Sequence, residues 1–272
     1  MGKLIKLPSR KGQIIYGPIH SRRIGVDIGI NLLVQEGKTC NFDCLYCQYG
    51  RTGNLVKTGH EGYIWVSPTE VSCELEKALS SLSKSGYHLD AVTFSGYGEP
   101  TLHPEFSIIV KDAKIVKDRY YPEAKLTLIT NSANLNTDKN LRALMLFDQI
   151  IAKLDAASNK AFHAINRPAD SDLNIEKIIE DLTVISKKTN RLILQILIFD
   201  TSDIRLKSNN SLEEMKALSD AVCKIKPKSV QIYTLVRASD YEELRPVDSE
   251  KLNQLRKLID AKCGGEVLVK IY

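Results

Sequence analysis

Short, almost entirely apolar runs alternate with longer amphipathic segments along most of this 272-residue chain. Apolar runs of four to eight residues that are rich in Val, Ile and Leu are typical of strands buried on both faces of a parallel sheet. The pattern predicts six strands, and a further short strand near the C-terminus is a candidate. Their expected ranges are 26–34, 89–94, 125–130, 149–154, 192–199 and 229–236, with the seventh at 267–271.

Amphipathic segments between these runs predict helices. In the first of them Val71, Leu75 and Leu79 recur at a spacing of four, and Pro68 suits a first helical turn. Ser211 with Glu214 has the spacing of a capping box. Strands that alternate with helices indicate βαβ units, so the class is α/β, but periodicity fits a doubly wound open sheet and a curved partial (β/α)6 barrel equally. The other helices are expected at about 103–117, 136–147, 173–187, 211–224 and 248–261, and Gly264 follows the last as a C-cap.

Composition and charge narrow the class of protein. Residues 1–25 are polar and basic and are interpreted as a lead-in segment, and no linker divides residues 26–272, which we expect to form one domain. The N-terminus lacks the apolar stretch of a secretory signal, and no apolar run is long enough to span a membrane. With three cysteines crowded as in a metal site, these features predict a cytoplasmic, reducing setting and no membrane partner. The formal charge of +5 permits an anionic substrate without requiring one.

Three cysteines carry the chemistry. Cys40, Cys44 and Cys47 form C-x-x-x-C-x-x-C directly after the first predicted strand, at the edge where α/β folds place their active sites. Electron carriers close a 4Fe–4S cluster with four cysteines, and a structural zinc site also takes four ligands, for which His20 or His60 would be needed. Three thiolates leave one iron open to a substrate group, so the cysteines are predicted to be both the metal ligands and the catalytic centre.

The other three cysteines are widely spaced. Cys73, Cys223 and Cys263 lie in or beside predicted helices. Free cysteine behaves as a small buried hydrophobe, so we expect core or surface thiols and no second cluster.

The cysteine motif resembles that of the radical S-adenosylmethionine (SAM) superfamily, in which an aromatic residue precedes the last cysteine, as Tyr46 does here. The resemblance implies two cofactors, a 4Fe–4S cluster and SAM. It also implies a flavodoxin-like or ferredoxin-like electron donor, and reductive cleavage of SAM to a 5′-deoxyadenosyl radical. It places the adenine of SAM near Tyr46.

A second motif strengthens the resemblance and selects the partial barrel over the open sheet. The run Ser95 to Pro100 reads Ser-Gly-Tyr-Gly-Glu-Pro, where the family has Gly-Gly-Glu-Pro beside the amino group of SAM. The resemblance extends from residue 20 to about residue 240. It implies that residues of the motif and residues in or after the later strands bind the cofactor. These are Gly96, Gly98, Glu99, Pro100, Asn131, Ser132, Lys153, Asp155, Gln195, Tyr233 and Arg237.

Within the superfamily, several further stretches, among them KLDA and INRP, are similar to the group that includes tRNA wyosine-base synthase. That enzyme has a second cluster on upstream cysteines, and this chain has no cysteine before Cys40, which indicates a shorter relative with its own substrate.

The substrate is not identified by the sequence, and RNA or a small anion are candidates. Basic residues that could meet an anion occur in the lead-in, at Arg10, Lys11, Arg22 and Arg23, and beside the cysteine motif, at Lys38, Arg51 and Lys57. Two other functions stay open: an activase that acts on a partner protein, and a non-enzymatic iron–sulfur or zinc protein.

Overall fold

The computed structural model describes residues 12–59, 63 and 65–272. Within them, one sheet has the order β1-β2-β5-β6-β7-β8-β9-β11, with β10 paired to β8, and a second small sheet joins β3 to β4. Neighbouring strands from β2 to β9, and then β11, are parallel, while β1 runs antiparallel to β2. The strands are β1 (Ile15–Ser21), β2 (Gly25–Ile30), β3 (Thr39–Cys40), β4 (Asn54–Leu55), β5 (Ala91–Phe94), β6 (Lys125–Thr130), β7 (Gln149–Lys153), β8 (Leu192–Thr201), β9 (Ser229–Thr234), β10 (Leu244–Pro246) and β11 (Leu268–Ile271).

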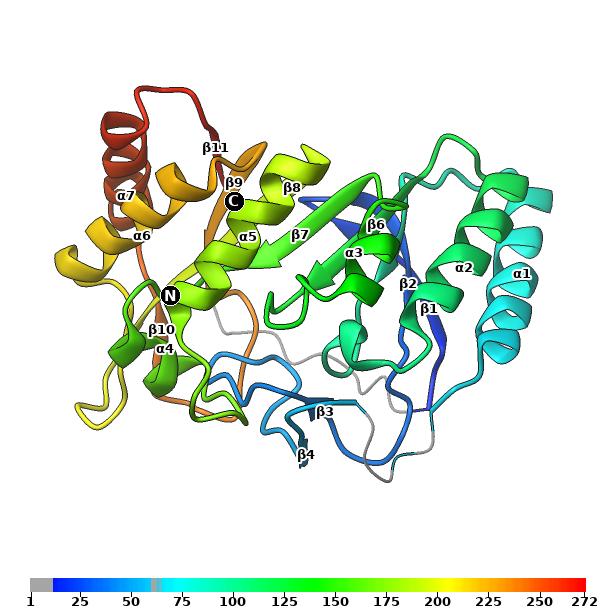
Figure 1. The fold of residues 1–272 in the computed structure, drawn as a ribbon, viewed down its shortest axis with the longest axis horizontal. Helices are drawn as coiled ribbons and strands as arrows, with labels where there is room; N and C mark the ends of the chain where they lie inside the picture. The colour runs from blue at the N-terminus through cyan, green and yellow to red at the C-terminus, as the bar shows by residue number, and fades with distance from the viewer. Residues whose placement is uncertain (1–11, 60–62, 64) are drawn as a thin grey trace.

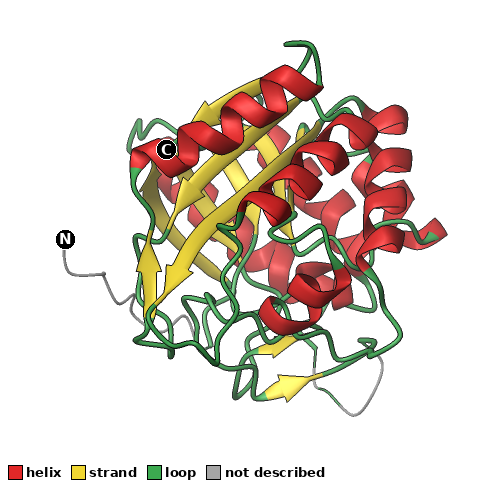
Figure 2. Ribbon diagram, turned by 90° about the vertical axis from the view of Figure 1, so that its left-hand side faces the viewer, coloured by secondary structure: helices red, strands yellow, loops and turns green. Residues whose placement is uncertain are grey.

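Helices pack along the outside of this sheet in chain order (Figure 1). The sheet is curved, and loops and the two-stranded sheet gather beyond one end of its strands (Figure 2). The helices are α1 (Pro68–Lys84), α2 (Phe106–Tyr120), α3 (Asp138–Leu144), α4 (Asn159–Ile165), α5 (Ile175–Thr189), α6 (Leu212–Ile225) and α7 (Ser249–Lys262), with a short 3₁₀ turn at Pro100–Leu102.

The predicted α/β class with a parallel sheet is confirmed, because all six predicted strands form and the candidate seventh is β11. Several predicted strands are too long: the first ends at Ile30 and the sixth at Thr234, and the second begins only at Ala91. The residues that follow Ile30 are still buried, as Leu32 and Leu33 show, but they belong to the loop that leads to the cysteines. The apolar run therefore predicted too long a strand, because these residues are buried although they lie outside it.

Strand β1 was not predicted. It lies inside the segment interpreted as a lead-in, where Gly17 and Pro18 interrupt the apolar pattern. Proline is tolerated on an edge strand, and β1 is at the edge of the sheet. The part of the lead-in that forms β1 therefore pairs with β2, while the domain boundary at residue 25 stays a prediction. The short elements β3, β4, β10 and α4 were also not predicted.

Aromatic packing between the sheet and the helices holds the middle of the fold. Phe94 of β5, Phe106 of α2 and Phe147 are fully buried, and their ring centroids lie 5.5–6.2 Å apart. Each such pair contributes about 0.5–1.5 kcal/mol beyond the area that it buries. This cluster anchors β5, whose C-terminal end carries the Gly-x-Gly-Glu-Pro turn.

The N-terminus of α6 departs from its predicted cap. The hydroxyl of Ser211 accepts from the amide of Glu214, as expected. The carboxylate of Glu214, however, accepts from the amides of Ala157 and Ser158 and from the Ser158 hydroxyl, at 2.6–3.1 Å. Glu214 thus connects α6 to the start of α4 instead of closing a capping box.

Two of the cysteines expected as free thiols are paired. Cys223 near the end of α6 and Cys263 at the end of α7 form a disulfide, so the prediction is wrong for both, whereas Cys73 is free and exposed. Parallel neighbouring helices bring together two residues that lie 40 positions apart, which spacing alone does not reveal. No helix among the described residues is long and apolar enough to span a membrane.

Candidate active site

The loop with the three cysteines is pinned to the Gly-x-Gly-Glu-Pro turn. The amide of Thr39 donates to the carbonyl of Tyr97, and the amide of Glu99 donates to the carbonyl of Thr39, both at 3.3 Å. Gly98, at φ +147°, lies between them, and a Cβ there would overlap the Thr39 carbonyl. Only glycine allows this close approach of two backbones. The contact fixes the residue that precedes Cys40.

The three cysteines lie at the end of β3 and in the turn that follows it. The amide of Cys47 donates to the carbonyl of Cys44 at 3.1 Å, which gives the turn its shape. Two side-chain amides reach the sulfurs from other elements: Asn131 Nδ2 lies 3.6 Å from Cys40 Sγ, and Asn166 Nδ2 lies 3.5 Å from Cys44 Sγ. Burial raises the pKa of Cys40 and raises that of Cys44 to about 11, so both thiols need a compensating positive charge to ionise.

Lys38 faces the cysteines rather than a substrate. It is only 2% exposed, and its Nζ donates to the carbonyl of Gly50 at 2.6 Å. Burial alone would lower the pKa of Lys38, but the negative charges of the three cysteines outweigh it, and the pKa is raised. The expectation that Lys38 meets an anionic substrate is therefore wrong, because its ammonium is enclosed beside the thiols.

These residues fit an iron–sulfur cluster. Three thiolates with amide donors aimed at two of them form the sulfur-ligand, hydrogen-bonded environment that such clusters take. Among the described residues, no three His, Cys, Asp or Glu side chains converge on a position that could hold a single metal ion. His60, considered above as a zinc ligand, lies outside the described residues.

Glu99 is enclosed by the protein. It is 2% exposed, and its carboxylate accepts from the amide and hydroxyl of Thr101, the hydroxyl of Thr130 and the amide of Asn131, at 2.6–3.1 Å. Burial raises the pKa of Glu99 more than these hydrogen bonds lower it. Glu99 thus joins the end of β5 to the end of β6, and Pro100 directly after it begins the 3₁₀ turn.

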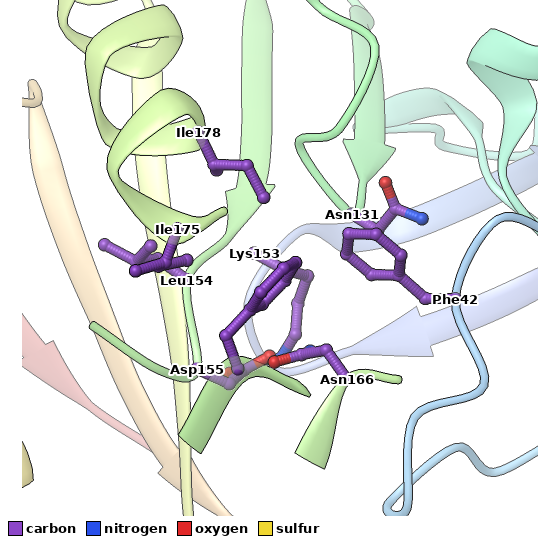
Figure 3. A pocket seen from close by; sticks show the side chains of 9 residues that line it. Phe42, Asn131, Lys153, Leu154, Asp155, Asn166, Ile175 and Ile178 are labelled. Carbon is purple, nitrogen blue, oxygen red and sulfur yellow. The ribbon is translucent and has the colours of Figure 1, made fainter. Parts of the chain in front are cut away.

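The ends of β6 and β7 are tied together beside the cysteines. Ser132, at φ +78°, is fully buried, and its hydroxyl donates to the carbonyl of Lys153 at 2.7 Å. Asn131 next to it lines a small cavity together with Lys153, Asp155 and Asn166 (Figure 3). The cavity volume of about 10 Å³ has room for one water molecule.

A chain of polar contacts runs from the cysteine loop across the sheet. The hydroxyl of Tyr46 accepts from Asn166 Nδ2 at 3.0 Å and donates to the carboxylate of Asp155. Asp155 pairs with Lys153 at 3.0 Å, and Lys153 Nζ donates to the hydroxyl of Tyr233 at 2.6 Å. Burial raises the pKa of Tyr46, and the Asp155 carboxylate raises it further.

The chain continues into β8 and β9. The hydroxyl of Tyr233 donates to Gln195 Oε1 at 3.3 Å, and Gln195 Nε2 donates to Gln231 Oε1 at 3.1 Å. The structure therefore brings together five residues that the family resemblance had proposed from the cysteine motif and from separate strands. These are Tyr46, Lys153, Asp155, Gln195 and Tyr233.

Arg237 lies apart from this chain of contacts. Its guanidinium donates to Gln48 Oε1, just after the last cysteine. The same segment closes on the cysteine loop again where Asp240 accepts from the Arg51 amide at 2.8 Å. Arg237 thus joins the segment after β9 to the cysteine loop.

The basic residues expected near the substrate differ in their surroundings. Arg51 is exposed, with its guanidinium 5.4 Å from the ring centroid of Tyr241, and Lys57 pairs with Asp170 at 3.0 Å. Arg22 is exposed, whereas Arg23 lies over the ring of Tyr233, 4.3 Å from its centroid. Arg10 and Lys11 lie outside the described residues.

Sequence reasoning assigned no role to Asn166. It is 5% exposed and contacts both Cys44 and Tyr46. Its stretch, Ile-Asn-Arg-Pro, was part of the family resemblance. The next residue, Arg167, has a positive φ of 49°. This unusual backbone conformation would have pointed to the site, but it is visible only in the structure.

A curved parallel sheet with a three-cysteine loop after its first parallel strand defines a class of iron–sulfur enzyme folds. Residues 36–194 match the family model described as the Radical SAM superfamily, and the chain belongs to this superfamily. The partial-barrel fold is confirmed by similar solved structures. The chain has a TM-score of 0.64 at 12% identity with a radical SAM methyltransferase from Sphaerobacter thermophilus, covering 90% of this chain and 65% of that one. With Streptococcus suis SuiB bound to S-adenosylmethionine the TM-score is 0.60 at 13% identity, covering 90% and 50%.

Curated relatives are similar over most of this chain. It is 29% identical to a protein described as GTPase Obg from Brachyspira hyodysenteriae, over 94% of this chain but only 35% of that protein. It is 27% identical to a UPF0026 protein of Methanocaldococcus jannaschii, over 92% of this chain and 72% of that one. A UPF0026 protein of Synechocystis is 29% identical over 92% of this chain and 93% of its own length.

Proposed function

We propose that this chain is a radical SAM enzyme that cleaves SAM reductively and uses the radical on a substrate yet to be identified. Membership of the superfamily implies an enzyme, SAM and a 4Fe–4S cluster. When bound, the reduced cluster supplies one electron to the sulfonium of SAM, which yields methionine and the 5′-deoxyadenosyl radical. The observation that carries the proposal is the set of Cys40, Cys44 and Cys47 beside the Gly-x-Gly-Glu-Pro turn.

The protein's own residues prepare this site. Cys40, Cys44 and Cys47 ligate the cluster, and no fourth protein ligand is proposed. Asn131 and Asn166 hydrogen-bond to two of the sulfurs, and Lys38 places a positive charge beside them. Hydrogen bonds and nearby charge set the reduction potential of such clusters.

SAM is proposed to bind along the strand ends. Gly96, Gly98 and Pro100 shape the turn that meets its amino group, and Glu99 holds that turn against β6. Asn131 and Ser132 complete the wall at the end of β6, and Tyr46 lies on the side proposed for the adenine. Asp155 and Arg237 act through their partners, by fixing Tyr46 and the segment after β9.

The likeness to the wyosine-base synthase group remains a hypothesis, since the curated relatives are described as UPF0026 proteins and as GTPase Obg. RNA and a small anionic metabolite remain the candidate substrates. A flavodoxin-like or ferredoxin-like protein is the proposed electron donor.

The test is anaerobic reconstitution followed by reduction with dithionite in the presence of SAM. We expect about four iron and four sulfide per chain, as in a 4Fe–4S cluster, and formation of 5′-deoxyadenosine and methionine. Replacing any one of the three cysteines with Ala should abolish both the cluster and the cleavage. Stoichiometric zinc without iron, or an intact cluster that leaves SAM uncleaved, would overturn the proposal.

A further inference from the structure

Two cations meet at one tyrosine inside the sheet. The guanidinium of Arg23 lies 4.3 Å from the ring centroid of Tyr233, and the ammonium of Lys153 lies 4.7 Å from the same centroid. Lys153 arrives from β7 and Tyr233 from β9, whereas Arg23 arrives from the turn between β1 and β2. The turn beside the edge strand β1 and two strands from farther along the sheet therefore supply this arrangement.

The carboxylate beside Lys153, that of Asp155, already has three partners. Asp155 accepts from Lys153 at 3.0 Å and from the amide of Leu197 at 2.7 Å through one oxygen, and from Tyr46 through the other. Among the described residues no carboxylate lies within ion-pair distance of Arg23. Asp155 balances the charge of Lys153, so within the described part of the chain the positive charge of Arg23 is left without an acidic partner.

An unbalanced positive charge is energetically unfavourable at a partly buried position. The Lys153 side chain is 14% exposed, and Arg23 and Tyr233 are half-buried. Repulsion between two cations is screened less here than at an open surface, and an anion that contacts both removes it. Guanidinium and ammonium groups both bind carboxylate and phosphate strongly, and a guanidinium can bind them through two parallel hydrogen bonds.

We propose that Arg23 and Lys153 bind the carboxylate or phosphate group of the substrate, against the ring of Tyr233. This proposal rests on the function proposed above, because it names the substrate class for that same site. It reassigns Lys153, Gln195 and Tyr233, which the sequence had placed with SAM, to the substrate side. Gln195 supports the site by accepting from the Tyr233 hydroxyl.

The matched control is on the same turn. Arg22 is exposed and adjacent to Arg23, and its side chain makes no hydrogen bond, ion pair or ring contact within the described part of the chain. Arg22→Gln therefore removes the same charge from the same turn without touching Tyr233. Arg23→Lys keeps the charge but loses the two-pronged geometry.

The experiment measures binding of inorganic phosphate, and separately of acetate, to the reconstituted protein saturated with SAM, by titration calorimetry. For the anion that the wild type binds, we expect about tenfold weaker binding in Arg23→Gln and in Lys153→Gln, which is the effect of losing one charge-assisted hydrogen bond. Arg22→Gln should bind as the wild type does, and Arg23→Lys should lie between. Comparing the two anions decides whether the group is a phosphate or a carboxylate.

The outcomes separate the two proposals. SAM affinity and 5′-deoxyadenosine formation should be unchanged in the control Arg22→Gln, and SAM affinity is measured separately in Arg23→Gln. If neither anion binds the wild type, or if binding is the same in Arg23→Gln and in the wild type, the anion site is wrong while radical SAM chemistry stands. If Arg23→Gln instead weakens SAM itself about tenfold, the anion is the carboxylate of SAM and the substrate assignment is overturned. Loss of SAM cleavage in the wild type would sink the proposed function instead.

Discussion

At the scale of single residues, the site depends on close approaches that only particular side chains permit. Gly98 is the sharpest case, because any Cβ there would overlap the carbonyl of Thr39. Asn131 is another, since its one amide group contacts Cys40 Sγ and Asn41 Oδ1 together. The sequence showed a glycine turn and a polar strand end, but not that both contact the residues around Cys40.

Replacing Gly98 with Ala should separate the cysteine loop from the turn at β5. The added methyl group forces the two backbones apart, so we expect most of the cluster iron to be lost on reconstitution. Iron analysis and the visible absorption of the cluster measure this. Gly86→Ala is the control: Gly86 also has a positive φ, of 68°, but a Cβ there would meet nothing within 4 Å. It should cost about 1 kcal/mol of stability and keep its iron, and equal iron loss in both variants would refute the argument.

Replacing Glu99 with Ala should weaken SAM binding and spare the cluster. The variant leaves the amide of Asn131 and the hydroxyl of Thr130 without their acceptor, so the ends of β5 and β6 lose their connection. Equilibrium dialysis of SAM and iron analysis on the same sample separate the two effects. Wild-type affinity for SAM would show that the turn does not meet SAM.

At the scale of elements, most of the fold was predictable because strands buried on both faces read as continuous apolar runs. The failures share one physical cause, which is that tertiary contacts rather than periodicity formed the element. β1 has Gly17 and Pro18 inside it and is stabilised by pairing with β2. The two-residue strands β3 and β4 are too short to have a pattern at all.

Tertiary contacts that the sequence does not reveal also limited the prediction of the site. Each polar strand end was visible in the sequence, but the contact of Lys153 with Tyr233 joins residues 80 positions apart. The stacking of Arg23 on Tyr233 required β1, which was missed. Local pattern identifies candidate residues, and the order of strands in the sheet decides which of them meet.

The turn between the 3₁₀ segment and α2 should make stability depend on pH. His103 is 1% exposed, its Nε2 donates to the carbonyl of Val66 at 2.9 Å, and its Nδ1 accepts from the amide of Glu105. Burial lowers the pKa of His103 from 6.5 to about 4, so folding favours the neutral ring. This contribution is complete above pH 6.5 and is lost as the pH falls from 6.5 towards 4, by about 3 kcal/mol in all.

Urea unfolding of the cluster-free protein at several pH values checks this, because the cluster has its own sensitivity to acid. His103→Gln should be less stable than the wild type at pH 7.5, and the difference should shrink as the pH falls. A difference that is the same at pH 7.5 and pH 5 would assign the pH dependence to other groups.

At the scale of the whole molecule, the two edges of the sheet are stabilised in different ways. One edge is covered by β1, whose turn also supplies Arg23 to the interior. At the other edge β11 pairs with β9, and the disulfide joins α6 to the end of α7. Disulfides are uncommon in reducing compartments, so this pair is at odds with the reducing, cytoplasmic setting that the sequence predicts, and the compartment stays a prediction.

The disulfide should stabilise the fold without serving the cluster. Cys223 and Cys263 close a loop across 40 positions, far along the chain from the cysteine motif. Replacing both with Ser should lower the free energy of unfolding by about 2–4 kcal/mol under non-reducing conditions. The triple variant that also replaces Cys73 should still bind the wild-type amount of iron, since no second cluster is proposed.

Cys73→Ser alone is the control, because Cys73 is exposed and unpaired, and its effect should stay within about 0.5 kcal/mol. Addition of a thiol reductant should remove the difference between the wild type and the double variant, which distinguishes loss of the covalent link from loss of packing. If the reduced wild type stays as stable as the oxidised protein, the link does not stabilise the C-terminal edge. Iron lost from the triple variant beyond the scatter of the wild type would instead reveal a second metal site on these cysteines.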